Sequence, residues 1–102
     1  MTEVINADNF KSKVLDSEVP VLVDFFATWC GPCMRVAPVV DEINEELAGE
    51  GAVYKVDIDE SSALASEYKV VSVPTFILFK GGEPVKQVTG GRPKADLMAM
   101  FE

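Results

Sequence analysis

Histidine is absent from the 102 residues, and cysteine occurs only twice, at Cys30 and Cys33. The absence of histidine excludes Ser-His and Cys-His catalysis, and it excludes any histidine-ligated metal site. Two cysteines form one disulfide at most, unlike the several that small secreted domains depend on. A bridge between them would close a loop of about four residues and contribute only about 2 kcal/mol, which is a weak reason to keep it for stability alone.

Clusters of basic residues are also absent, since nine Lys and Arg stand against 17 Asp and Glu and give a net charge of −8. Affinity for nucleic acid depends largely on neutralising phosphates, so we expect no nucleic-acid partner. No apolar run approaches the roughly 20 residues of a membrane helix, and no signal peptide is visible. We therefore expect no membrane association and a cytoplasmic location.

The length favours a single domain, residues 1–102, that buries about two-thirds of its unfolded surface. Val21–Ala27 is almost entirely apolar, which predicts a central strand buried on both faces. Strands alternate with helices and are followed by a hairpin and a last helix, an order that favours an α/β fold with a mixed sheet between helices. The other predicted strands are Thr2–Ile5, Val53–Asp59, Thr75–Phe79 and Glu83–Thr89, and the predicted helices are one capped by Asn6, one from Pro32 to about Gly49, Ser62–Tyr68 and Lys94–Phe101.

The two cysteines lie in Trp29-Cys30-Gly31-Pro32-Cys33, at the junction between the central strand and the long helix. Redox chemistry is one interpretation, in which one thiolate attacks a disulfide and the other resolves the mixed intermediate. Half of a metal site and a purely structural pair are the alternatives. One chain offers no further cysteine or histidine to complete a metal site, so the spacing and position favour redox chemistry without metal or bound cofactor.

The positions of the two sulfur atoms distinguish their roles. Cys30 lies at the start of the predicted helix, where free N–H groups and the positive end of the helix dipole stabilise a thiolate. Cys33 lies one turn later and is expected to be more buried. We therefore predict that Cys30 is the attacking nucleophile and that Cys33 is the resolving thiol.

Three further features have two interpretations each. Asp24, the only charge in the central strand, is either a buried carboxyl whose raised pKa suits proton transfer, or a structural residue at a sheet edge or paired with Lys55. Proline at the first position of a strand is an ordinary terminator, so the residues alone favour a trans bond between Val73 and Pro74. Trp29 either belongs to the core or contacts a substrate.

Over essentially its full length the sequence resembles the thioredoxin family. The resemblance implies the thioredoxin fold, a central mixed five-stranded sheet flanked by four helices, with Cys30 exposed at the start of the long helix. It rests on the Trp-Cys-Gly-Pro-Cys motif at residues 29–33 and on Val23–Phe25, Ala27, Ala37-Pro38, Val56–Asp59, Val73–Phe76 and Phe79–Gly82.

The resemblance also implies roles for residues around the cysteines. It implies that Pro74 is cis and faces them, and that the backbone before it pairs with an extended substrate. Asp24 then helps to move the proton of Cys33, with Lys55 as its neighbour. The implied substrate groove is lined by Trp29, Gly31, Pro32, Val73, Pro74 and Gly90.

The implied function is that of a general protein-disulfide reductase, a monomeric enzyme that reduces client proteins and is recycled by a thioredoxin reductase. An oxidase or isomerase on the same fold, a binding role within a larger protein and a metal-bridged dimer are the alternatives. The sequence departs from many relatives at Phe26, where they have tryptophan, and at Met34, where they have lysine. The second change removes a positive charge near Cys30, which Arg92 restores if it lies near the groove.

Overall fold

Five strands form one mixed sheet in the computed structural model, which describes residues 2–102. Their order across the sheet is β1-β3-β2-β4-β5. β3 pairs in parallel with β1 and β2, whereas β4 pairs in antiparallel fashion with β2 and β5. The predicted mixed sheet is confirmed, and its strands are β1 (Glu3–Ile5), β2 (Val21–Phe26), β3 (Ala52–Asp57), β4 (Thr75–Lys80) and β5 (Glu83–Thr89).

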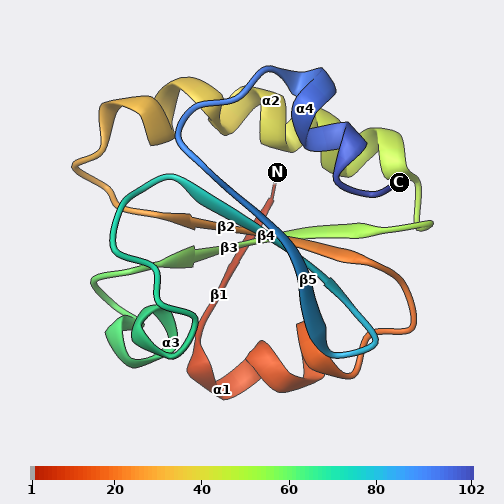
Figure 1. Cartoon of the computed structure of the whole chain (residues 1–102), viewed down its shortest axis with the longest axis horizontal. Helices are drawn as coiled ribbons and strands as arrows, with labels where there is room; N and C mark the ends of the chain where they lie inside the picture. Colours follow the sequence, from red (N-terminus) through yellow and green to blue (C-terminus); the bar gives the residue numbers. More distant parts are fainter. Residues whose placement is uncertain (1) are drawn as a thin grey trace.

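Helices cover both faces of the sheet, as the order of elements predicts. Figure 1 shows α2 and α4 on one side of the sheet and α1 and α3 on the other. The bounds are α1 (Ala7–Phe10), which continues into a π-helical turn η1 (Lys11–Leu15), α2 (Gly31–Leu47), α3 (Ser62–Glu67) and α4 (Lys94–Ala99). Within residues 2–102, no helix has both the length and the apolarity needed to cross a membrane.

The first helix begins at the cap that the sequence predicts. The Asn6 side chain accepts a hydrogen bond of 2.9 Å from the Asp8 N–H, and the Asn9 side chain accepts one of 2.8 Å from the Asn6 N–H. This reciprocal capping satisfies two N–H groups that a helix start otherwise leaves unpaired. The helix then packs Phe10 and Val14 against the sheet.

β2 is the central strand, and all six of its residues are buried. Successive side chains of a strand point to opposite faces of the sheet. Val23 and Phe25 therefore pack with α1, η1 and α3, whereas Leu22 packs with α2 and α4. The same alternation places Asp24 on the face that α2 covers. An ionisable side chain thus lies under the helix that starts at the two cysteines.

The predicted turn at Gly81-Gly82 joins β4 to β5. Both glycines have positive φ, +58° at Gly81 and +83° at Gly82, which suits the two central positions of a tight hairpin turn. A Cβ atom at Gly82 would lie 3.0 Å from the backbone oxygen of Leu15, so a side chain there would be crowded as well as strained in conformation. The turn lies at the end of β4 opposite to Thr75, where the strand starts.

Candidate active site around Cys30 and Cys33

The backbone after β2 brings Cys30 to the N-terminus of α2. The Cys30 N–H donates a 3.2 Å hydrogen bond to the Ala27 carbonyl, which closes a turn between strand and helix. Cys30 is the N-cap residue of α2, and its Sγ accepts a 3.1 Å hydrogen bond from the Cys33 N–H. Pro32 occupies the first turn, where a missing N–H has no cost. The sulfur therefore replaces the side-chain oxygen of an ordinary helix cap.

Cys30 and Cys33 are joined by a disulfide, with their Cα atoms 5.3 Å apart. They pack in a small apolar cluster with Phe26 and Ala27, against which Ile58 and Val73 also pack. Cys30 retains 5% of its accessible surface and Cys33 retains 1%. The expected order of burial is therefore correct, but the expectation of an exposed Cys30 is wrong in this disulfide-bonded form. The surrounding apolar side chains cover most of Cys30.

The segment before β4 forms a second wall beside the cysteines. The Val73–Pro74 peptide bond is cis, so the resemblance is correct here and the trans expectation from residue frequencies is wrong. Pro74 is buried, and its carbonyl accepts a 2.8 Å hydrogen bond from the Gly90 N–H. The Thr75 hydroxyl donates a 2.7 Å hydrogen bond to the Ser72 carbonyl. These bonds tie Gly90 and the residues around Pro74 into one fixed unit.

Trp29 lies on the surface rather than in the core, with 69% of its side chain exposed. Its Nε1–H donates a 2.9 Å hydrogen bond to an Asp59 carboxylate oxygen. The Asp59 N–H in turn donates a 2.8 Å hydrogen bond to the Asp57 carboxylate, at the end of β3. The indole is therefore held in place while its ring remains available for contact, which fits the substrate interpretation and excludes the core interpretation.

Asp24 is fully buried at the centre of the sheet, so the edge-strand interpretation is wrong. Neither of its carboxylate oxygens has a hydrogen-bond partner among the described residues. Burial raises the pKa of the Asp24 carboxyl from its ordinary value of 3.8 to about 7, because ionisation without water is unfavourable, and the charge of Lys55 offsets part of that rise. The group therefore changes its protonation state close to neutral pH.

Lys55 lies beside Asp24 in the sheet, as predicted, because the two residues are register partners on β2 and β3. No ion pair joins them among the salt bridges of residues 2–102. The Lys55 ammonium instead lies 4.5 Å from the centre of the Phe26 ring, a cation–π contact. The alternative of a salt-bridged structural aspartate is therefore wrong, and Lys55 acts on Asp24 only through its nearby charge.

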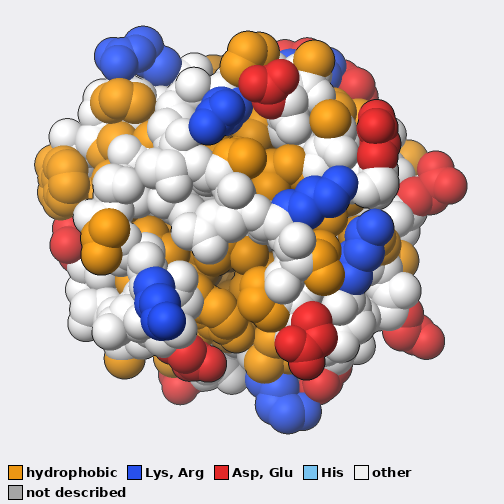
Figure 2. Space-filling view, in the orientation of Figure 1, with side chains coloured by type: hydrophobic (Ala, Val, Ile, Leu, Met, Phe, Trp, Pro, Cys, Tyr) orange, Lys and Arg blue, Asp and Glu red, His pale blue; other side chains and the backbone are white. Residues whose placement is uncertain are grey.

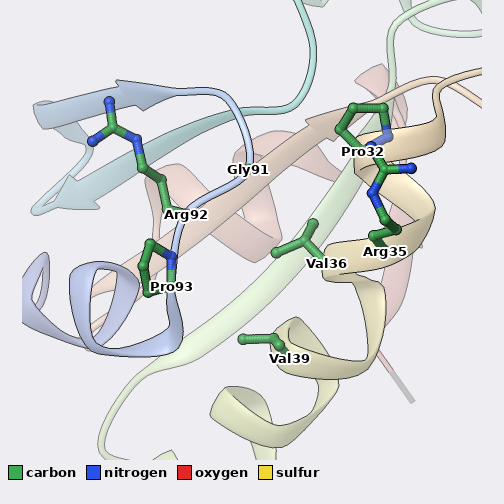
Figure 3. A pocket seen from close by; sticks show the side chains of 7 residues that line it. All are labelled: Pro32, Arg35, Val36, Val39, Gly91, Arg92 and Pro93. Atoms are coloured by element: carbon green, nitrogen blue, oxygen red, sulfur yellow. The ribbon is translucent and has the colours of Figure 1, made fainter.

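Two arginines line a pocket that begins at Pro32, between the cysteines, and the sequence predicts a role for Arg92 alone. Arg92 lies at a pocket on the segment between β5 and α4, and Arg35 lies across the same pocket on α2 (Figure 3). A Cβ atom at Gly31 would lie 3.3 Å from Arg35 Nη1, so this guanidinium lies over the backbone between the cysteines. Arg35 thus supplies, one residue later, the positive charge that Met34 does not carry. The sequence signal for this proximity is the i, i+4 spacing of Gly31 and Arg35, which puts the two residues on one face of a helix.

The other predicted groove residues lie around this site. Gly31 and Pro32 are exposed in the first turn of α2, and Val73 packs against the cysteine cluster. Gly90 contacts the site through its bond to Pro74, whereas its neighbour Gly91 lines the pocket with Pro32. Within residues 2–102, no group of three or more Cys, Asp or Glu side chains is arranged to hold a metal ion.

Comparison with known proteins identifies close relatives. The profile of the thioredoxin family matches residues 1–102. Thioredoxin 1 of Nostoc sp. is 51% identical over 98 residues, covering 96% of this chain and 92% of that protein. The thioredoxin of Synechocystis sp. is 50% identical over 101 residues, 99% of this chain and 94% of that one. A bifunctional thioredoxin reductase/thioredoxin of Mycobacterium leprae is 52% identical over 96 residues, 94% of this chain and 21% of that protein.

Replacing Asp24 with asparagine is expected to stabilise the oxidised protein at pH 8. Because the folded-state pKa is about 7 against an ordinary 3.8, the folded state keeps a proton that the unfolded chain loses, and the parent loses stability as the pH rises from about 4 to about 7. The full effect above pH 7 is up to about 4 kcal/mol. Urea unfolding at pH 4, 6 and 8 measures the difference between variant and parent.

The control is Asp96→Asn, which removes one carboxylate from an exposed position on α4. A gain for Asp24→Asn that is the same at pH 4 and pH 8 would contradict the assignment of a buried carboxyl that titrates near pH 7.

Proposed function

This chain belongs to the thioredoxin family and is a thiol–disulfide oxidoreductase, and from that premise we propose that it is a general reductase of protein disulfides. The observation that carries the proposal is the position of Cys30 Sγ at the N-cap of α2, where the Cys33 N–H points at it. A sulfur in this position is stabilised as a thiolate after reduction, and the thiolate is the form that attacks disulfides.

The surface around the cysteines supports protein clients. Trp29, Met34 and Val71 are among the few large apolar side chains exposed in the described chain, with 69%, 46% and 94% of their surfaces accessible. Trp29 and Met34 flank the Cys-x-x-Cys segment, and Val71 lies in the segment before the cis-proline. Exposed apolar side chains that flank a reactive group, as Trp29 and Met34 do, are typical of a surface that binds another protein.

In the proposed first step, the Cys30 thiolate attacks one sulfur of the client disulfide. A bond forms between Cys30 Sγ and that sulfur, the client S–S bond breaks, and the other client sulfur leaves as a thiolate. The client lies along the backbone at Val73, extended beside the cis-proline, in the manner of an added strand. Val73 and the cysteines already pack in one cluster, so this backbone is close enough to guide the client.

In the second step, Cys33 resolves the mixed disulfide. Its thiolate attacks Cys30 Sγ, the bond to the client breaks, and the reduced client leaves while the Cys30–Cys33 disulfide forms. Two electrons have then passed from the enzyme to the client. We assign Asp24 as the group that accepts the Cys33 proton, because it is a buried carboxyl on the face covered by α2 and has no hydrogen-bond partner of its own within the described chain.

Lys55 supports this proton transfer by its charge. Its half-buried ammonium lies over Phe26, and its positive charge lowers the pKa of Asp24 against the larger effect of burial. Without it the carboxyl would remain protonated to higher pH and would be a poorer proton acceptor at neutrality.

A thioredoxin reductase is the proposed electron donor that restores the dithiol. The Mycobacterium leprae relative is named as a fusion of thioredoxin reductase and thioredoxin, which supports such a partner for this chain. We further propose that residues 1–102 act as one domain and as a monomer, since a single chain holds both cysteines and Asp24. A cytoplasmic location follows from the same proposal, because a reductase must work where thiols are kept reduced.

The reduction potential of the Cys30–Cys33 pair tests the direction of the reaction. We expect a value below the cytosolic glutathione poise of about −220 to −260 mV, which makes the dithiol a net electron donor. Equilibration with dithiol buffers followed by counting free thiols gives the value. A potential near the roughly −120 to −180 mV of oxidases and isomerases would instead assign the protein to that class.

Replacing the resolving cysteine is expected to trap clients. Cys33→Ser removes the second step, so mixed disulfides between Cys30 and client proteins accumulate in a lysate and are released by dithiothreitol. The matched variant Cys30→Ser is expected to trap few or none, since Cys33 is the more buried sulfur. Non-reducing electrophoresis compares them. If Cys30→Ser trapped clients and Cys33→Ser did not, the two roles would be reversed.

The proposed role of Asp24 as proton acceptor is tested by measuring only the second step, in which the client is released from the mixed disulfide. We expect Asp24→Asn to slow client release from a preformed mixed disulfide at pH 7 by about a hundredfold, the lower end of what a positioned acid or base contributes. Rapid mixing with a fluorescent peptide disulfide separates this step from the initial attack. A release rate equal to that of the parent across pH 6 to 8 would leave Asp24 with a structural effect only.

A further inference from the structure

An open pocket of about 550 Å³ continues from the active site along α2. Its α2 wall is formed by Pro32, Arg35, Val36 and Val39, whose spacing of three, four and seven residues places them on one face of the helix. The opposite wall is the segment 91–93 between β5 and α4 (Figure 3). Prolines and valines make the floor apolar, and the pocket starts beside the cysteine pair.

The charges at this pocket are opposite to the charge of the whole molecule. Arg35 and Arg92 lie on its two walls, although the net charge is −8. Neither guanidinium is paired with a carboxylate among residues 2–102. Arg35 lies over the backbone of Gly31, and Arg92 uses its Nε to donate a 3.2 Å hydrogen bond to the Thr89 carbonyl. Both arginines are exposed at the rim and keep donors free for an incoming anion.

The nearest acidic residues on the same face of α2 are already neutralised. Glu42 and Glu46 continue the stripe of Pro32, Arg35 and Val39, and the Lys94 ammonium bridges both of their carboxylates. Figure 2 shows blue side chains over the start of α2 and over the segment that leads to α4, with no red side chain between them and a red side chain directly beside the second. The pocket therefore carries two positive side chains on an acidic protein, with the exposed Asp96 of α4 as the next acidic residue along the chain from Arg92.

We propose that this pocket is a client-docking subsite that selects disulfides with acidic residues close to the reacting cysteine. An aliphatic or proline side chain of the client covers the apolar floor, while an aspartate or glutamate binds Arg35 or Arg92. The occupant is a peptide segment because a protein disulfide must reach Cys30, and carboxylates are the anions that an unmodified peptide offers. The inference rests on the proposed reduction of protein disulfides and adds a preference among clients.

The test compares disulfide-linked peptides that differ only at the residue two positions from the cysteine, which is glutamate, glutamine or lysine. Prereduced protein is mixed rapidly with each peptide, so no reductase enters the measurement. We expect the glutamate-to-lysine ratio of second-order rate constants to fall about two- to fivefold for Arg35→Gln, the range of an exposed ion pair, and further for Arg35→Gln combined with Arg92→Gln. Arg35→Glu is expected to reverse the preference.

The control variant is Lys80→Gln, which removes the same charge from the exposed end of β4, six residues beyond Pro74. Lys80→Gln changes the net charge by the same amount as Arg35→Gln, so any general repulsion of acidic peptides affects both variants equally.

Arginine variants with the same glutamate-to-lysine ratio as Lys80→Gln would overturn the inference. The inference would also be overturned if the arginine variants reacted more slowly with all three peptides to the same extent, and if iodoacetamide alkylated their Cys30 more slowly by the same factor. That result would mean that the arginines stabilise the Cys30 thiolate and do not bind the client. If the parent reduced none of the peptides, the proposed function itself would fail.

Discussion

The junction at which β2 ends and α2 begins is the constraint on which the rest of the site depends. β2 is fixed by burial on both faces and by pairing on both edges, so the position of its last residue has little freedom. The turn from Ala27 to Cys30 then places one sulfur at the helix N-cap, and the helical repeat places the second sulfur within bonding distance. A Cys-x-x-Cys pair in a mobile loop would have neither the helix N–H groups nor a fixed partner.

The position and burial of Asp24 depend on the same strand, β2. Its two neighbours on that face of β2 are Leu22, in the core beneath α2, and Phe26, which packs with the cysteines. A carboxyl in this position receives no hydrogen bond from the described residues, and it lowers stability at neutral pH. Because an unpartnered buried acid lowers the stability of the fold, its presence indicates a functional role rather than a role in folding.

The proposed substrate side of the site is assembled from distant parts of the chain. The hydrogen bond from Gly90 to Pro74 joins the cis-proline segment to the end of β5, and the segment after Gly90 faces α2 across the pocket. Thr75 and Thr89 are register partners, so pairing of β4 with β5 fixes this arrangement. Trp29 directly precedes Cys30, and Arg35 follows Cys33 by two residues, so an exposed apolar side chain and a positive one both adjoin the cysteine segment.

Local pattern in the sequence determined the elements and the chemistry. The apolar run of β2, the cap at Asn6, the glycine turn and the Cys-x-x-Cys spacing each depend on neighbouring residues, and so could be read directly. The cis bond at Pro74 was opposed by residue frequencies and expected only from the family resemblance. Only the tertiary structure decided that Cys30 is almost covered, that Lys55 lies over Phe26 instead of pairing with Asp24, and that Arg35 and Arg92 line the two walls of one pocket. These features depend on which side chains meet from separate elements, and no local sequence pattern specifies that.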